Sequence, residues 1–239
     1  MPLIQFINKS KFNIGIWKIA DHEYNPEFSR VLHPKYHSEL YFYKNNKRKI
    51  QIHAAKLLFE QLAPGNELYL ENNKPCIRGN EKFVSISHTK DLIAMIIAKY
   101  PCGIDIESTE RDTTKIKHKF LNDDDFTSGK SNEKLIQNWC SKEVLYKING
   151  RKDIHFKDHL TVKKNGEFFS GYCEHPNIKF LKSQMSVDLL TDDLRKKRSS
   201  NQSFWLIGQP DIEILKENNE YKVKVKGFDY YNPLSTGEI

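Results

Sequence analysis

The clearest pattern of apolar positions in the first half of the chain is that of a helix. Between residues 46 and 63, apolar side chains recur at steps of three and four, and Pro64-Gly65 then supplies a stop signal. The first turn of this predicted helix carries Lys47, Arg48 and Lys49, and basic residues at that place oppose the helix dipole. The cluster is therefore either a solvated helix end or a site for an anion.

Strand patterns flank the predicted helix. A strand is expected over residues 14–20, and residues 21–38 read as loop or short helix. Residues 83–87 alternate like a half-buried strand, whereas residues 92–98 are nearly all apolar and predict a strand buried on both faces. A turn is expected at residues 72–75.

A strictly alternating segment opens the second half of the chain. In residues 103–107, Gly-Ile-Asp-Ile-Glu, the two acidic side chains share one face of the predicted strand while the isoleucines face the core. Helices are predicted over residues 113–126 and 132–148, and weaker strand-like stretches continue to about residue 183. Asp105 and Glu107 are therefore expected side by side.

Composition and charge narrow the possible partners without choosing one. Hydrophobic residues make up 38% of the chain and include 14 Phe and 11 Tyr, which is enough for a folded core. The formal net charge of +7 favours an anionic partner, such as a phosphorylated cofactor, an acidic protein or nucleic acid.

The pattern contains no membrane or secretion signal. The longest apolar run, residues 92–98, is far shorter than the about 20 residues of a membrane-spanning helix, and the N-terminus does not read as a secretory signal. The four cysteines form no Cys-x-x-Cys pair and are expected as reduced thiols. A cytoplasmic protein without a membrane partner is therefore expected.

Two segments carry acidic residues suited to metal chemistry. Asp105 and Glu107 would repel each other when held side by side, so a cation between them would be favourable, and carboxylate oxygens suit Mg²⁺ or Mn²⁺. A strand with one solvated polar face is the alternative. Glu143 and Lys147 share a helical stripe with Trp139 at steps of four, where an ordinary exposed ion pair is the alternative. Metal-assisted phosphoryl transfer uses carboxylates of this kind with a cation and a base.

Four short segments, taken in order, resemble the motifs of one enzyme family. Residues 73–77 match a Lys-Pro turn, and residues 84–89 a Ser-His motif whose hydroxyl and imidazole groups suit a phosphate. Residues 103–107 match a Gly-Ile-Asp-Ile-Glu motif and residues 139–147 a Trp-x-x-Lys-Glu-x-x-x-Lys motif. With these segments, the chain resembles the 4′-phosphopantetheinyl transferases of the long, pseudo-dimeric type that activates surfactin synthetase.

The resemblance implies an α+β fold of two similar α/β halves with coenzyme A bound between them. It also implies a monomer that acts on an acyl or peptidyl carrier protein. Residues 1–101 would form the N-terminal half, which contacts the nucleotide phosphates. Residues 102–184 would form the C-terminal half with the metal and catalytic residues, and residues 185–239 an atypical tail.

The same resemblance assigns roles to single residues. Three acidic residues would bind Mg²⁺, namely Asp105, Glu107 and Glu143. Four further residues would hold the phosphates of the nucleotide, namely Arg48, Lys74, Ser87 and His88. Glu143, directly or through a water, would deprotonate the carrier serine, and Lys147 would steady the phosphate oxygens. Asp125 lies where many relatives carry an acidic residue near the metal.

The end of the chain departs from this family. Residues 185–239 resemble a segment of adenine-specific DNA methyltransferases from restriction systems. No methyl-donor loop and no Asp/Asn-Pro-Pro-Tyr motif accompanies them, so we infer no methylation. Strands of this tail, such as residues 221–225, are expected either to pack on the rest of the chain or to extend from it.

Two other functions remain open from the residues. One is a Mg²⁺-dependent nuclease or DNA-associated enzyme, since acidic pairs near a Glu and a Lys also occur there. The other is a non-catalytic module that binds coenzyme A or a carrier protein. The Lys-Pro turn and the Ser-His-Thr segment favour coenzyme A over nucleic acid, and the three acidic residues favour an enzyme over a binding module.

Overall fold

The computed structural model describes residues 3–19, 43–126, 131–150, 152–165, 168–174, 185–189, 203–210, 212–217 and 220–225. It divides the chain into two compact units, Met1–Ile106 and Glu107–Ile239, and each is described by itself. Both contain antiparallel strands and a long helix, so the described part of the chain is a mixed α and β structure. The three-part division expected from the resemblance stays a prediction.

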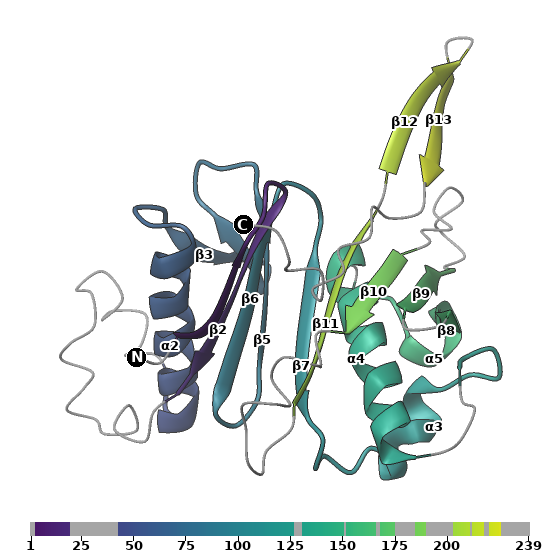
Figure 1. Ribbon diagram of the computed structural model, residues 1–239, viewed down its shortest axis with the longest axis horizontal. Coiled ribbons are helices and arrows are strands. Elements are labelled where there is room, and N and C mark those ends of the chain that lie inside the picture. The colour runs from purple at the N-terminus through teal and green to yellow at the C-terminus, as the bar shows by residue number, and fades with distance from the viewer. Residues whose placement is uncertain are drawn as a thin grey trace, which may run out of the picture. The chain divides into compact units, whose positions relative to one another are not determined.

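The first unit is a four-stranded antiparallel sheet with a helix on one face (Figure 1). The strands, in spatial order, are β1 (Leu3–Asn8), β2 (Phe12–Lys18), β6 (Leu92–Ala98) and β5 (Phe83–His88). Helix α2 (Asn46–Leu62) packs on them and buries Leu58 and Phe59 completely. The packing is close at Gly15 of β2, where a Cβ atom would lie 2.6 Å from Leu58 Cδ1.

The elements predicted for this unit are confirmed, with ends shifted by one or two residues. Asn45 caps α2, and its side chain accepts a hydrogen bond from the N–H of Arg48 at 3.3 Å. All seven residues of β6 are buried, as expected. The predicted turn connects two strands that were not predicted, β3 (Leu68–Glu71) and β4 (Lys74–Ile77), which pair as a hairpin. The loop or short helix expected over residues 21–38 lies outside the described residues.

The hairpin turn has a specific backbone requirement. Asn72 and Asn73 adopt positive φ angles of 51° and 67° between the two strands. Asn tolerates this left-handed region better than most residues, and two such residues in succession form a tight hairpin turn. The turn places Lys74 at the start of β4.

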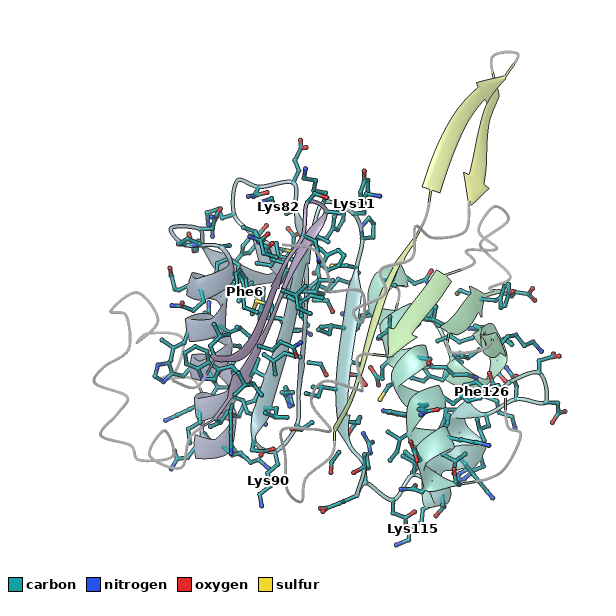
Figure 2. The ribbon with its side chains drawn as sticks, viewed as in Figure 1. Phe6, Lys11, Lys82, Lys90, Lys115 and Phe126 are labelled. Carbon is teal, nitrogen blue, oxygen red and sulfur yellow. The ribbon has the colours of Figure 1, made fainter. Side chains whose placement is uncertain are left out.

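Exposed lysines of the first unit lie at both ends of its sheet. Lys11 and Lys82 lie at one end of the sheet and Lys90 at the opposite end (Figure 2). These three lysines therefore do not by themselves select a partner.

The second unit builds a sheet from four consecutive antiparallel strands. They are β8 (Leu160–Asn165), β9 (Phe168–Cys173), β10 (Met185–Leu189) and β11 (Ser203–Pro210). Helix α4 (Asn132–Asn149), which confirms the helix predicted over residues 132–148, packs on them. Gly171 of β9 permits this packing, since a Cβ atom there would lie 2.4 Å from Leu145 Cδ2. Across the described ranges, no helix is both long and apolar enough to cross a membrane.

The segment predicted as an atypical tail contributes to this sheet. Its strands β10 and β11 pair with each other, and β10 also pairs with β9. Further along the tail, β12 (Ile212–Glu217) and β13 (Glu220–Val225) pair with each other as a hairpin. The first two strands of the tail are therefore integrated in the second unit.

The prediction of a single helix over residues 113–126 is wrong. The chain forms only a 3₁₀ turn, Thr114–Ile116, and a short helix, α3 (Lys117–Phe120). Beyond α3, the N–H of Asn122 donates to Asp125 Oδ2 at 2.9 Å, and the N–H of Asp124 donates to Asn122 Oδ1 at 3.1 Å. Asn and Asp side chains that bond to nearby backbone in this way compete with a continuing helix.

Candidate functional site

A pocket of about 780 Å³ lies in the first unit between α2, the β3–β4 hairpin and strands β5 and β6. This volume is typical of sites for small molecules and cofactors. Its wall includes Arg48 from the first turn of α2 and His88 from the end of β5, and Arg48 Nη1 lies 2.9 Å from His88 Nε2. Two of the residues predicted to hold phosphates therefore meet at one pocket.

Other cationic side chains line the same pocket. Lys56 of α2 is 6% exposed and donates from Nζ to the carbonyl oxygen of Leu68 at 2.7 Å. The guanidinium of Arg78 lies over the ring of Tyr69, 4.9 Å from its centroid, and Nε is 2.9 Å from Glu67 Oε2. With Arg48, these side chains place three cations at the wall of the pocket, and one of them, Arg78, is paired with Glu67.

Lys74 and Ser87 do not line this pocket. Lys74 is exposed, and it lies between two wall residues, Asn73 and Pro75. Ser87 precedes His88 on β5, and because successive residues of a strand face opposite sides, Ser87 points to the other face of the sheet. Of the four residues assigned to the nucleotide, Arg48 and His88 line the pocket and Ser87 lies on the other face of the sheet.

On that other face, Ser87 contacts strand β7 (Gly103–Ser108). Its hydroxyl donates to Asp105 Oδ1 at 2.7 Å and accepts from the N–H of Ile106 at 3.3 Å. Ser85 Oγ accepts from the N–H of Ile104 at 3.2 Å in the same manner. Serine hydroxyls therefore hold β7 in place and orient Asp105.

Asp105 does not belong to a solvated polar face. Only 4% of the residue is exposed, and Ile104 and Ile106 on the opposite face of β7 are buried as predicted. A carboxylate in such a place requires hydrogen bonds or a positive partner, because burial disfavours its charge. The interpretation of β7 as a strand with one solvated polar face is therefore wrong at this position.

In the second unit, Glu107 is connected to helix α4 through Arg111. Glu107 and Arg111 form an ion pair with side chains 18% and 35% exposed. The guanidinium of Arg111 lies over the ring of Trp139, 4.9 Å from its centroid. Trp139 in turn packs against Phe120 and Phe156, with ring centroids 5.3 and 5.4 Å apart. Arg111 thus links Glu107, the last residue of the Gly-Ile-Asp-Ile-Glu motif, to Trp139, the first residue of the Trp-x-x-Lys-Glu-x-x-x-Lys motif.

Glu143 and Lys147 follow Trp139 along α4 at steps of four. Both residues are half-buried, so the exposed surface position assumed in the alternative does not describe them. Arg111 contacts the first residue of this stripe, Trp139.

The oxygen donors of Asp105, Glu107 and Glu143 have the chemistry that Mg²⁺ prefers. Within the ranges that the structure describes, no three His, Cys, Asp or Glu side chains are gathered as a metal site. Asp105 belongs to the first unit, and Glu107 and Glu143 belong to the second. The assignment of these three residues to a metal stays a prediction.

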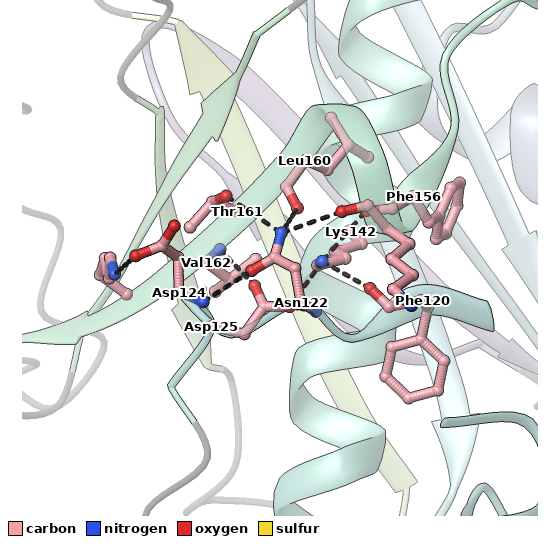
Figure 3. A network of polar contacts seen from close by, with 11 residues as sticks. Phe120, Asn122, Asp124, Asp125, Lys142, Phe156, Leu160, Thr161 and Val162 are labelled. Atoms are coloured by element: carbon pink, nitrogen blue, oxygen red, sulfur yellow. Dashed lines mark hydrogen bonds and ion pairs between the residues drawn. The ribbon is translucent and has the colours of Figure 1, made fainter. Parts of the chain in front are cut away.

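Asp125 has a structural role in a buried network (Figure 3). Lys142 Nζ lies 2.6 Å from Asp125 Oδ2, and both side chains are fully buried. Lys142 also donates to the carbonyl oxygens of Phe120 and Phe156 at 2.6 and 3.0 Å. Burial lowers the pKa of the Lys142 ammonium, and the nearby carboxylate of Asp125 opposes this shift. The network joins α4 to the segments on either side of it.

The sequence contained a partial signal for this network and none for Arg111. Lys142 falls on the same stripe of the predicted helix as Leu135, Asn138 and Leu145, all of which are buried. A lysine in that stripe requires a buried partner, so the pattern could have indicated that Lys142 has one. Arg111 lies outside the helices and strands, where side-chain spacing predicts nothing.

No protein-family model matches the chain, and no curated protein matches it. The similarity to phosphopantetheinyl transferases therefore stands on the four motifs alone.

Proposed function

We propose that this chain transfers the 4′-phosphopantetheinyl arm of coenzyme A to a serine of an acyl or peptidyl carrier protein, with release of 3′,5′-ADP. The observation that carries the proposal is the contact between Arg48 and His88, 40 residues apart in sequence, on the wall of a cationic pocket. The motif resemblance assigns both residues to the phosphates of the nucleotide.

Contacts between the motif segments support the proposal. In the first unit, Ser87 of the Ser-His motif bonds to Asp105 of the Gly-Ile-Asp-Ile-Glu motif. In the second unit, Arg111 joins Glu107 of that motif to Trp139 of the last one. Each of these contacts joins two motif segments within one unit.

The proposed chemistry distributes the steps among these residues. Arg48 and His88, which line the pocket, bind phosphate oxygens of the nucleotide. Glu143 accepts the proton of the carrier serine, directly or through a water, as its hydroxyl attacks the β-phosphate. Lys147 stabilises the charge on the phosphate as 3′,5′-ADP leaves. Asp105, Glu107 and Glu143 would hold Mg²⁺, which would neutralise negative charge on the pyrophosphate.

The proposal extends to the fold and the setting. It includes two similar halves on one chain that act together as a monomer, in the manner of pseudo-dimeric transferases. We also propose that the protein acts in the cytoplasm, where it would encounter coenzyme A and unmodified carrier proteins.

Incubation with coenzyme A, Mg²⁺ and an unmodified carrier protein tests the proposal. We expect the carrier to gain the mass of one phosphopantetheinyl arm, with an equal amount of 3′,5′-ADP released. Cleavage of DNA together with unchanged carriers would instead support the nuclease. Binding of coenzyme A without transfer to any of several carriers would support the binding module.

A further inference from the structure

The ion pair between Arg111 and Glu107 is partly withdrawn from water. The side chain of Glu107 is 18% exposed and that of Arg111 is 35% exposed. Opposite charges in such a place interact more strongly than on a fully exposed surface, where solvent and salt screen them. Arg111 is therefore a substantial electrostatic partner for this carboxylate.

Arg111 is also held in place by groups other than Glu107. Its guanidinium lies over the ring of Trp139, which is a favourable position for a cation. Its N–H donates to the carbonyl oxygen of Ser108 at 3.1 Å, and its own carbonyl oxygen accepts from Asn132 Nδ2 at 2.8 Å. Its positive charge would consequently stay close to Glu107 even if the carboxylate bound another cation.

We propose that Arg111 is the counter-ion of Glu107 in the metal-free protein and lowers the affinity of this carboxylate for a divalent cation. The inference rests on the proposed function, in which Glu107 is a metal ligand. A divalent cation at Glu107 is repelled by the guanidinium and must share or displace its ion pair. Arg111 then remains over the ring of Trp139.

Calorimetric titration of the full chain with Mn²⁺, in the absence of coenzyme A, tests the inference. Arg111→Gln removes the positive charge and keeps hydrogen-bond donors, and we expect it to bind Mn²⁺ about tenfold more tightly than the wild type. Arg111→Lys keeps the charge and should bind Mn²⁺ with nearly the wild-type affinity. The double variant Glu107→Gln/Arg111→Gln should lose the gain, because the effect passes through Glu107.

Arg78 offers a matched control in the first unit. Like Arg111, it pairs with a glutamate, Glu67, and lies 4.9 Å from the centroid of an aromatic ring, that of Tyr69. Glu67 is not one of the predicted metal ligands, so Arg78→Gln should leave the Mn²⁺ affinity unchanged. Thermal unfolding of every variant would show whether a change in affinity merely reflects a change in folding.

The outcomes separate this inference from the proposed function. Equal or weaker Mn²⁺ binding by Arg111→Gln, with clear binding by the wild type, overturns the role of Arg111 and leaves the proposed function standing. Binding by neither the wild type nor Arg111→Gln overturns the inference and the metal assignment of Glu107 together.

Discussion

Replacement of Lys142 by Met tests the buried network of the second unit. The ammonium lies 2.6 Å from Asp125 Oδ2 and donates to the carbonyl oxygens of Phe120 and Phe156. Met preserves most of the side-chain volume and the helix propensity but removes all three contacts. We expect a large loss in the free energy of unfolding.

The magnitude depends on what the substitution leaves behind. Removal of one partner from a buried ion pair costs about 3–5 kcal/mol, because the other charge stays buried. Asp125 still accepts from the N–H of Asn122 at 2.9 Å and from that of Val162 at 2.8 Å. These bonds keep the carboxylate partly compensated, so we expect the lower end, about 3 kcal/mol. The double variant with Asp125→Asn should lose less than the sum of the two single variants.

Urea unfolding followed by tryptophan fluorescence is a suitable assay, since Trp139 packs against Phe120 and Phe156 beside the network. Lys163→Met is the matched control. Lys163 Nζ lies 3.4 Å from Asp124 Oδ1 in an exposed pair, and its removal should cost less than about 1 kcal/mol. Equal losses for Lys142→Met and Lys163→Met would refute the reasoning.

Three further predictions follow from packing and titration. Gly171→Ala should lower stability by about 1–3 kcal/mol in thermal unfolding, because the new Cβ would lie 2.4 Å from Leu145 Cδ2; unchanged stability would contradict this packing. Burial raises the pKa of the Cys102 thiol to about 12, so alkylation followed by mass spectrometry should label the half-buried Cys76 first, and equal rates would contradict the burial. Between the ordinary pKa of 9.0 and about 12, the unfolded chain has lost the Cys102 proton that the folded chain keeps, so this thiol makes stability fall as pH rises. Cys102→Ala should flatten that fall in urea midpoints, and an unchanged slope would contradict the shift.

Elements with long, repeating burial patterns were predictable from the sequence. α2, β6 and α4 each bury a regular set of positions, and their apolar spacing identified them. The prediction of one helix over residues 113–126 was wrong for two reasons. Asn122 and Asp125 bond to each other beyond the end of α3, and Lys142 of α4 holds Asp125 in an ion pair. The spacing of apolar residues within one segment does not predict a contact with another helix, such as the one between Asp125 and Lys142.

The sequence identified individual residues of the candidate site, but it did not predict which of them lie together. The motifs led to His88, Asp105 and Glu107, and the basic first turn of the predicted helix led to Arg48. Each of these residues lies in a described contact or pocket. Ser87 and His88 were assigned together, although strand alternation already implied opposite faces. Arg111, Arg78 and Lys56 could not be predicted, because tertiary packing alone brings these cations to their partners.

The most direct test of the central claim is the intact mass of a carrier protein after incubation with coenzyme A, Mg²⁺ and either the wild type or Asp105→Asn. Asn removes the negative charge yet can still accept the hydrogen bond from Ser87, so the variant should unfold at nearly the wild-type urea concentration. The account predicts one phosphopantetheinyl arm added by the wild type and none by the variant. An unmodified carrier with the wild type, or equal modification by both proteins, would contradict it.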